Sequence, residues 1–169
     1  MSGSPFHSDE PPDREWHRSQ AREANNGIYG LLDEVGASAD HDDRLLHQVH
    51  AAAYHWGIAG TIEHRARAEY LCSRVHAYLG RPESAFQHAH RCRELIEEAG
   101  MVDWDLAFAH EALARASACA GDLEAASSHR RAAAAVPVED PQDWAIVEAD
   151  MAAGPWFGLE PDPSGTTQP

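Results

Sequence analysis

Residues 61–99, TIEHRARAEYLCSRVHAYLGRPESAFQHAHRCRELIEEA, decide the fold of this chain. They are predicted to form two helices joined by the turn at 79–82, where a glycine ends the first helix and a proline occupies the first turn of the second. The pattern returns 41 positions later, and the matching pairs are Ala66 with Ala107, Arg74 with Arg115, Gly80 with Gly121 and Ala85 with Ala126. A fixed period of this length is typical of stacked helical hairpins. The sequence therefore predicts an all-α fold.

Capping residues and apolar spacing place the other helices. The expected helices span residues 22–35, 43–56, 61–80, 82–100, 103–120, 122–136 and 140–152. Turns at Gly36, Gly80 and Gly121 would divide the first six into three antiparallel hairpins, stacked as a short solenoid. The seventh would be a C-terminal capping helix that covers the exposed apolar face of the last hairpin.

The two ends of the chain differ in composition from its centre. Residues 1–20 are rich in Ser, Pro and acidic side chains without periodicity, which predicts a disordered leader before a helical domain at 21–153. Residues 154–169 form a tail rich in Pro and Gly, in which Trp156 and Phe157 could fold back on the last helix.

Composition limits the possible partners and locations. The 169 residues carry a formal net charge of −15, which argues against a nucleic-acid backbone or an anionic membrane as partner. We find no apolar run near the ~20 residues of a membrane span and no secretory signal at the start. The cysteines Cys72, Cys92 and Cys119 are odd in number and lack a CxxC pair, so we expect reduced, buried thiols in a cytoplasmic protein.

Two segments resemble the centre of a tetratricopeptide repeat (TPR): LGRPESA at 79–85 and AGDLEAA at 120–126. In that family a glycine ends the first helix, and a small residue five positions later packs the second helix against it; Ala85 and Ala126 hold that position here. Ser73 and Ala114 would hold the other small position. The period of 41 to 44 residues departs from the family's value of about 34. The segment DLAFAHEALARA (105–116) is also similar to uncharacterised actinobacterial helical-repeat proteins, which implies no activity.

The TPR resemblance implies a concave surface, lined by the first helix of each hairpin, that binds a peptide or a protein partner. The residues that map to it are Glu23, Asn26, Arg67, Tyr70, Arg74, Phe108, Glu111 and Arg115. Some members of the family clamp a C-terminal carboxylate, and the equivalent positions of Arg74 and Arg115 would let both guanidinium groups converge on one. The alternative is that each arginine pairs with a nearby glutamate such as Glu69 or Glu111.

Twelve histidines are unusual in a chain of this length. Histidines and glutamates on facing helices can build a zinc, iron or copper site. The candidate ligands are His50, His55, Glu69, His88, His110 and Glu111, and one possible cluster is His55, Glu69, His88 and Glu111. The sequence contains no HExxH or CxxC motif, whose spacing would be a specific indication of a metal site. The alternatives are packing, which we expect for His76 and His110 in place of core aromatic residues, and pH sensing.

Three functions are compatible with the sequence. The first is a small cytoplasmic interaction module that binds a peptide, a protein or a second copy of itself. The second is a His/Glu metalloprotein, which could also be an enzyme. A third possibility is a structural subunit that docks through the apolar tail around Trp156.

Overall fold

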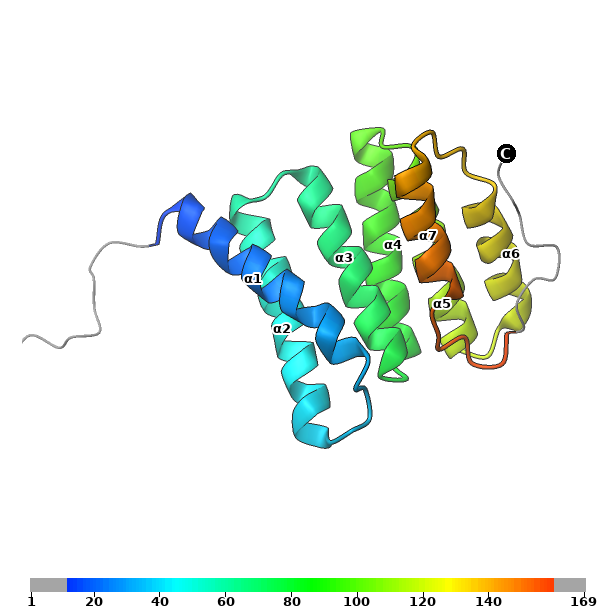
Figure 1. The fold of residues 1–169 in the computed structure, drawn as a ribbon, viewed down its shortest axis with the longest axis horizontal. Helices are drawn as coiled ribbons and strands as arrows, with labels where there is room; N and C mark the ends of the chain where they lie inside the picture. Colours follow the sequence, from blue (N-terminus) through cyan, green and yellow to red (C-terminus); the bar gives the residue numbers. More distant parts are fainter. Residues whose placement is uncertain (1–11, 160–169) are drawn as a thin grey trace, which may run out of the picture.

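The computed structural model describes residues 12–159, and this part of the chain is all-helical, as the sequence predicts. Figure 1 shows its seven helices. They are α1 (Arg14–Leu32), α2 (Ala39–Ala59), α3 (Ile62–Tyr78), α4 (Pro82–Ala99), α5 (Trp104–Cys119), α6 (Leu123–Ala134) and α7 (Pro141–Ala152). None of the helices within residues 12–159 is both long and apolar enough to cross a bilayer.

The first helix begins eight residues earlier than the sequence indicated. Asp13 caps it, because its carboxylate accepts a hydrogen bond from the backbone N–H of Trp16 at 2.8 Å. Ala21 is fully buried against Trp56 and Ala68, so this early part of α1 packs on the domain. Residues 14–20 are therefore helical, and the prediction that they belong to a disordered leader is wrong; residues 1–11 lie outside the described part.

The helices from α3 onward begin and end within two residues of the predicted positions, whereas α2 begins four residues earlier than predicted, because Ser38 caps it. The Thr61 side chain and His64 form a capping box at the start of α3. Gly80 and Gly100 follow α3 and α4 with φ values of +67° and +64°, in the left-handed region that glycine adopts without strain. The hairpin turn that the sequence placed at 79–82 is thus present.

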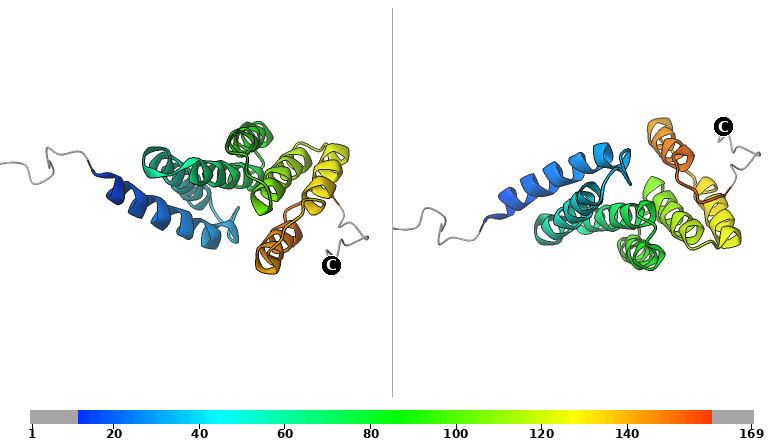
Figure 2. Two further views of the ribbon diagram at one scale, coloured as in Figure 1. Left: turned by 90° about the horizontal axis from the view of Figure 1, so that it is seen from above. Right: turned by 90° about the horizontal axis from the view of Figure 1, so that it is seen from below.

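The helices pack mainly in consecutive pairs, α1 on α2, α3 on α4 and α5 on α6. Further contacts of α2 with α3, α4 with α5 and α3 with α5 join these pairs. Seen along the edge of the molecule, α1 and α7 stand on the same side of α3 and α5, whereas α4 lies on the opposite side (Figure 2). The result is a floor of α3 and α5 with α1 and α7 at its two ends.

The core is divided between the two halves of this arrangement. One cluster joins α1, α2 and α3 around Ile28, Leu45 and Leu71, and a larger one joins α3, α4, α5 and α7 around Phe108 and Leu113. The segment after α7 folds back, as the sequence suggested for Trp156. The Trp156 indole N–H donates to the carbonyl of Met151 at 3.0 Å, and this ring lies against the buried guanidinium of Arg115.

Candidate functional site

A cavity of about 350 Å³ lies on the α3–α5 floor between α1 and α7. We call it the groove. Its aromatic side chains come from four helices. The groove is lined by Asn25, Tyr29, Trp56, His64, Ala66, Arg67, Tyr70, Leu71, Cys92, Ile96, Trp104, Asp105, Phe108, Ile146 and Asp150.

The aromatic floor of the groove is built by neighbouring turns of α3 and α5. The rings of Tyr70 and Phe108 lie 4.8 Å apart between centroids, and Trp104 meets Phe108 edge-on at 5.6 Å. Tyr29 on α1 and Ile146 on α7 form the rims and are 50% and 56% exposed. The groove therefore offers a buried aromatic base with two apolar side chains that still face water.

The polar groups of the groove are dominated by carboxylates. Arg67 forms two hydrogen bonds with Asp105, at 2.9 and 3.0 Å, and its guanidinium lies 4.3 Å from the centre of the Trp104 ring. The hydrogen bond with Asp105 raises the pKa of Arg67, and the charges of Glu63 and Asp143 raise it further. Three carboxylates thus act on Arg67 at this end of the groove.

Asp150 of α7 is held by α3. Its carboxylate forms an ion pair with Arg74 at 2.8 Å and accepts a hydrogen bond from the Tyr70 hydroxyl at 3.3 Å. Arg74 itself is almost fully buried. Burial lowers the pKa of Arg74, but its interactions with Tyr70, Glu111 and Asp150 raise it more, so Arg74 stays protonated. Arg74 therefore fastens α7 to the floor.

Arg115 also fastens α7, and it is fully buried. It pairs with the equally buried Glu111 one helical turn earlier. The same guanidinium donates to backbone carbonyls at the end of α7 and beyond it, at 3.0 Å to Asp150, 3.2 Å to Ala153 and 3.1 Å to Pro155. This cation satisfies carbonyls that a helix C-terminus leaves without partners.

The expectation that Arg74 and Arg115 converge on a partner's carboxylate is therefore wrong. Both arginines are already neutralised by carboxylates of the chain itself, Asp150 and Glu111. Of the six predicted contact residues on α3 and α5, Arg67, Tyr70 and Phe108 line the groove, whereas Arg74, Glu111 and Arg115 lie beneath it.

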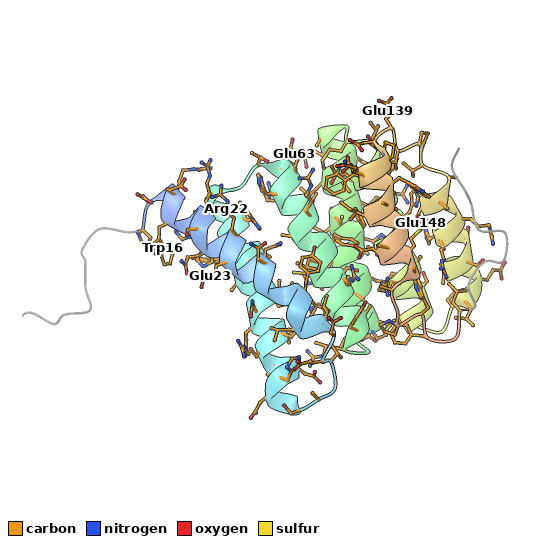
Figure 3. The ribbon with its side chains drawn as sticks, in the orientation of Figure 1. Trp16, Arg22, Glu23, Glu63, Glu139 and Glu148 are labelled. Atoms are coloured by element: carbon orange, nitrogen blue, oxygen red, sulfur yellow. The ribbon has the colours of Figure 1, made fainter. Side chains whose placement is uncertain are left out.

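The α1 wall uses a different face from the predicted one. Asn25 and Tyr29 line the groove, and the predicted residues Glu23 and Asn26 do not. Figure 3 shows Glu23 on the side of α1 that points away from α3. Ala21, Ile28 and Leu32 are the buried residues of α1, and Asn25 and Tyr29, four and eight positions after Ala21, lie on the side of the helix that borders the groove.

A second polar cluster lies where α2, α3 and α4 meet. One ring nitrogen each of His50 and His88 and the sulfur of Cys72 all lie within 4.8 Å of one another. The Nδ1 of His88 is 2.6 Å from a carboxylate oxygen of Glu69. We call His50, Glu69, Cys72, His76 and His88 the histidine cluster.

His76 completes the cluster and was not among the predicted ligands. Its Nε2 lies 3.2 Å from the Nε2 of His50, and its ring stacks on His88 with 5.3 Å between centroids. Burial, followed by the nearby His88, His50 and Arg81, lowers the pKa of His76 to about 4. Burial and His88 also lower the pKa of His50. Both rings are therefore neutral at pH 7, with a lone pair available.

The structure separates the other predicted metal ligands from this cluster. His55 pairs with His17, with 2.7 Å between their Nδ1 atoms, and the ring of His110 lies beside that of His129. Glu111 is buried against Arg115. The proposed set of His55, Glu69, His88 and Glu111 is therefore not formed, and only His50, Glu69 and His88 of the six candidates come together.

One pattern in the sequence could have identified the missing members. Glu69, Cys72 and His76 are spaced i, i+3 and i+7, so they lie along one face of α3. The groove residues Ala66, Arg67 and Tyr70 lie on a different face of the same helix. The two polar sites thus use opposite sides of α3.

Comparison of this chain with protein-family models, with curated proteins and with solved structures finds no match in any of the three.

Proposed function

We propose that this chain is a small interaction module that binds a basic, partly apolar segment of a protein partner in the groove. The observation that carries the proposal is the groove itself, an aromatic-floored cavity of about 350 Å³ with exposed apolar rims. Aromatic side chains that are already held in place contribute large contact areas at little cost in conformational entropy, and they are typical of binding sites.

The proposed fold is three stacked TPR-like hairpins, α1–α2, α3–α4 and α5–α6, followed by α7. The consecutive pairing of helices and the glycine turns support this assignment. So does the close approach of α3 and α4, where the Ser73 hydroxyl donates to the carbonyl of the fully buried Ala85 at 2.9 Å. In such an array the first helices of the hairpins face the ligand, and α1, α3 and α5 all contribute to the groove.

Charge favours a basic occupant over an acidic one. The chain carries a formal net charge of −15; Asp105 and Asp150 of the groove pair with Arg67 and Arg74, and Glu63 and Asp143 add further negative charge beside it. Glu63 and Glu139 also lie along the same edge of the molecule (Figure 3). An arginine or lysine side chain would be attracted by these carboxylates and could stack on the rings, whereas an acidic segment would be repelled.

Fluorescence anisotropy with short labelled peptides tests the proposal. The probes are a peptide with leucine and phenylalanine between arginines, and the same peptide with every arginine replaced by glutamate. We expect binding of the basic peptide only, with an affinity that falls as salt is raised. Equal binding of the acidic peptide, or binding of neither, would refute the proposal.

Substitution at the rims assigns the binding to the groove. Tyr29→Ala removes a ring that is half exposed, and we expect a loss of about 1–2 kcal/mol, or roughly 5–30-fold in affinity. Tyr54→Ala is the matched control, because Tyr54 is 64% exposed on α2 and does not line the groove. Equal losses in the two variants would place the peptide elsewhere.

A further inference from the structure

We infer that the histidine cluster is a zinc site in which His50, Cys72 and His88 bind the ion and a solvent molecule completes the coordination. The three side chains come from α2, α3 and α4, so one ion would join three helices. None of the three lines the groove. This inference is therefore independent of the proposed interaction function.

The geometry of the cluster is close to that of a tetrahedral zinc site. Bonds of about 2.0–2.3 Å from zinc to nitrogen and sulfur place neighbouring ligand atoms about 3.3–3.7 Å apart. The three ligand atoms already lie within 4.8 Å of one another. Side-chain rotations that shift these atoms by about 1 Å would bring them to bonding distance.

Glu69 prepares His88 for this role. A carboxylate can only accept a hydrogen bond, so the 2.6 Å contact with Glu69 requires the proton of His88 on Nδ1. Nε2 is then the ring nitrogen that can bind the ion. A carboxylate that orients a histidine in this way is the usual outer partner of zinc-bound imidazoles. The ring of His76 is stacked on the ring of His88, with 5.3 Å between centroids, and this contact limits the rotation of His88.

The donor set favours zinc over magnesium and calcium. One sulfur and two imidazole nitrogens suit Zn²⁺, whereas Mg²⁺ and Ca²⁺ prefer oxygen ligands. Cys72 is buried, but His50 is exposed, so the cluster opens to water on the α2 side. Three protein ligands with one position open to solvent are typical of zinc sites that accept an exchangeable ligand.

Zinc titration of tag-free protein, first stripped with a chelator, tests this assignment. Competition with a chromophoric chelator measures the affinity, and we expect one tight equivalent of zinc. Cobalt replaces zinc in a parallel experiment, and a sulfur-to-cobalt charge-transfer band should appear in the near ultraviolet. That band reports a thiolate ligand, so it should be absent in Cys72→Ser protein.

Three variants separate the cluster from the other histidines of the chain. His50→Ala should weaken zinc binding by about 100-fold or more, because loss of even an outer partner costs about 10–100-fold. Glu69→Gln should weaken it by about 10–100-fold. His47→Ala, an exposed histidine one turn away on α2, is the control and should leave the affinity unchanged.

Two results would overturn the assignment. The first is an unchanged zinc affinity in His50→Ala protein, which would place the ion at another histidine pair such as His17 and His55. The second is a cobalt spectrum without the sulfur band in the parent protein. If Cys72→Ser disturbs folding, as circular dichroism would reveal, His50→Ala decides the question, because the exposed His50 ring contributes little to the core.

Discussion

Replacement of Arg115 by methionine should be among the most destabilising single changes available in this protein. Methionine replaces the stem of Arg115 as far as Nε, so the space left empty is only that of the guanidinium carbon and its two terminal nitrogens. It removes the cation from Glu111, which is fully buried, and the donors from three carbonyls at the end of α7. A buried carboxylate left without its partner costs about 3–5 kcal/mol. For a domain of this size that corresponds to a fall of roughly 6–20 °C in Tm.

The double variant Glu111→Leu/Arg115→Met isolates the charge from the rest of the effect. Because it removes the unpaired carboxylate as well, we expect it to be more stable than Arg115→Met by about 2 kcal/mol. Urea denaturation followed by circular dichroism measures the free energy of unfolding of both variants and of Glu111→Leu alone. The carbonyls of α7 lose their donor in both Arg115 variants, so their contribution cancels in the comparison.

Two outcomes would refute this reasoning. One is a loss of less than about 1 kcal/mol in Arg115→Met, which would mean that water or a rearranged α7 satisfies Glu111. The other is a double variant no more stable than the single one. In that case the carbonyl contacts, and not the buried charge, would account for the destabilisation.

Two further predictions concern the packing and the titration of the helical array. Ala85→Leu should lower the free energy of unfolding, measured by urea denaturation, by about 1–3 kcal/mol, because Ala85 is fully buried where α3 crosses α4. The control Ala51→Leu, on the exposed face of α2, should change it by less than about 0.5 kcal/mol. Similar effects of the two substitutions would contradict the close crossing. Burial, followed by the charge of Arg93, lowers the pKa of both His110 and His129 below 6.5. The unfolded chain therefore binds more protons at these rings than the folded chain does, and stability is lost as the pH falls below 6.5. His110→Gln/His129→Gln protein should show a shallower fall in denaturation midpoint between pH 7 and 5, and an unchanged slope would exclude these two rings as the cause.

The helices could be predicted from the sequence because local chemistry determines where they begin and end. Thr61, Gly80 and Gly100 act within a few residues of themselves, and each has the predicted effect. The start of α1 was missed because its cap, Asp13, directly follows two prolines, and the leader around it has no apolar periodicity.

The groove could be predicted only in part, because its α7 wall depends on distant contacts. Of the residues that the TPR resemblance assigns to the concave surface, Arg67, Tyr70 and Phe108 line the groove, and their contact with a partner stays a prediction. It could not show that Arg74 would meet Asp150, which lies 76 positions later (150 − 74) on a helix outside the repeat. The same limit applies to the histidines, because only the packing of α2, α3 and α4 brings His50 close to His76.

The attachment of α7 has a consequence for the binding that we propose for the groove. Ile146 lies on α7, the helix that Arg74 and Arg115 hold in place. These two arginines therefore also determine where Ile146 lies and how wide the groove opens. Arg115 has no exposed surface, so no ligand can touch it. A survey of surface residues would therefore overlook the side chain that sets the shape of the opening. Variation in specificity among similar chains should be sought beneath the groove as well as on its rims.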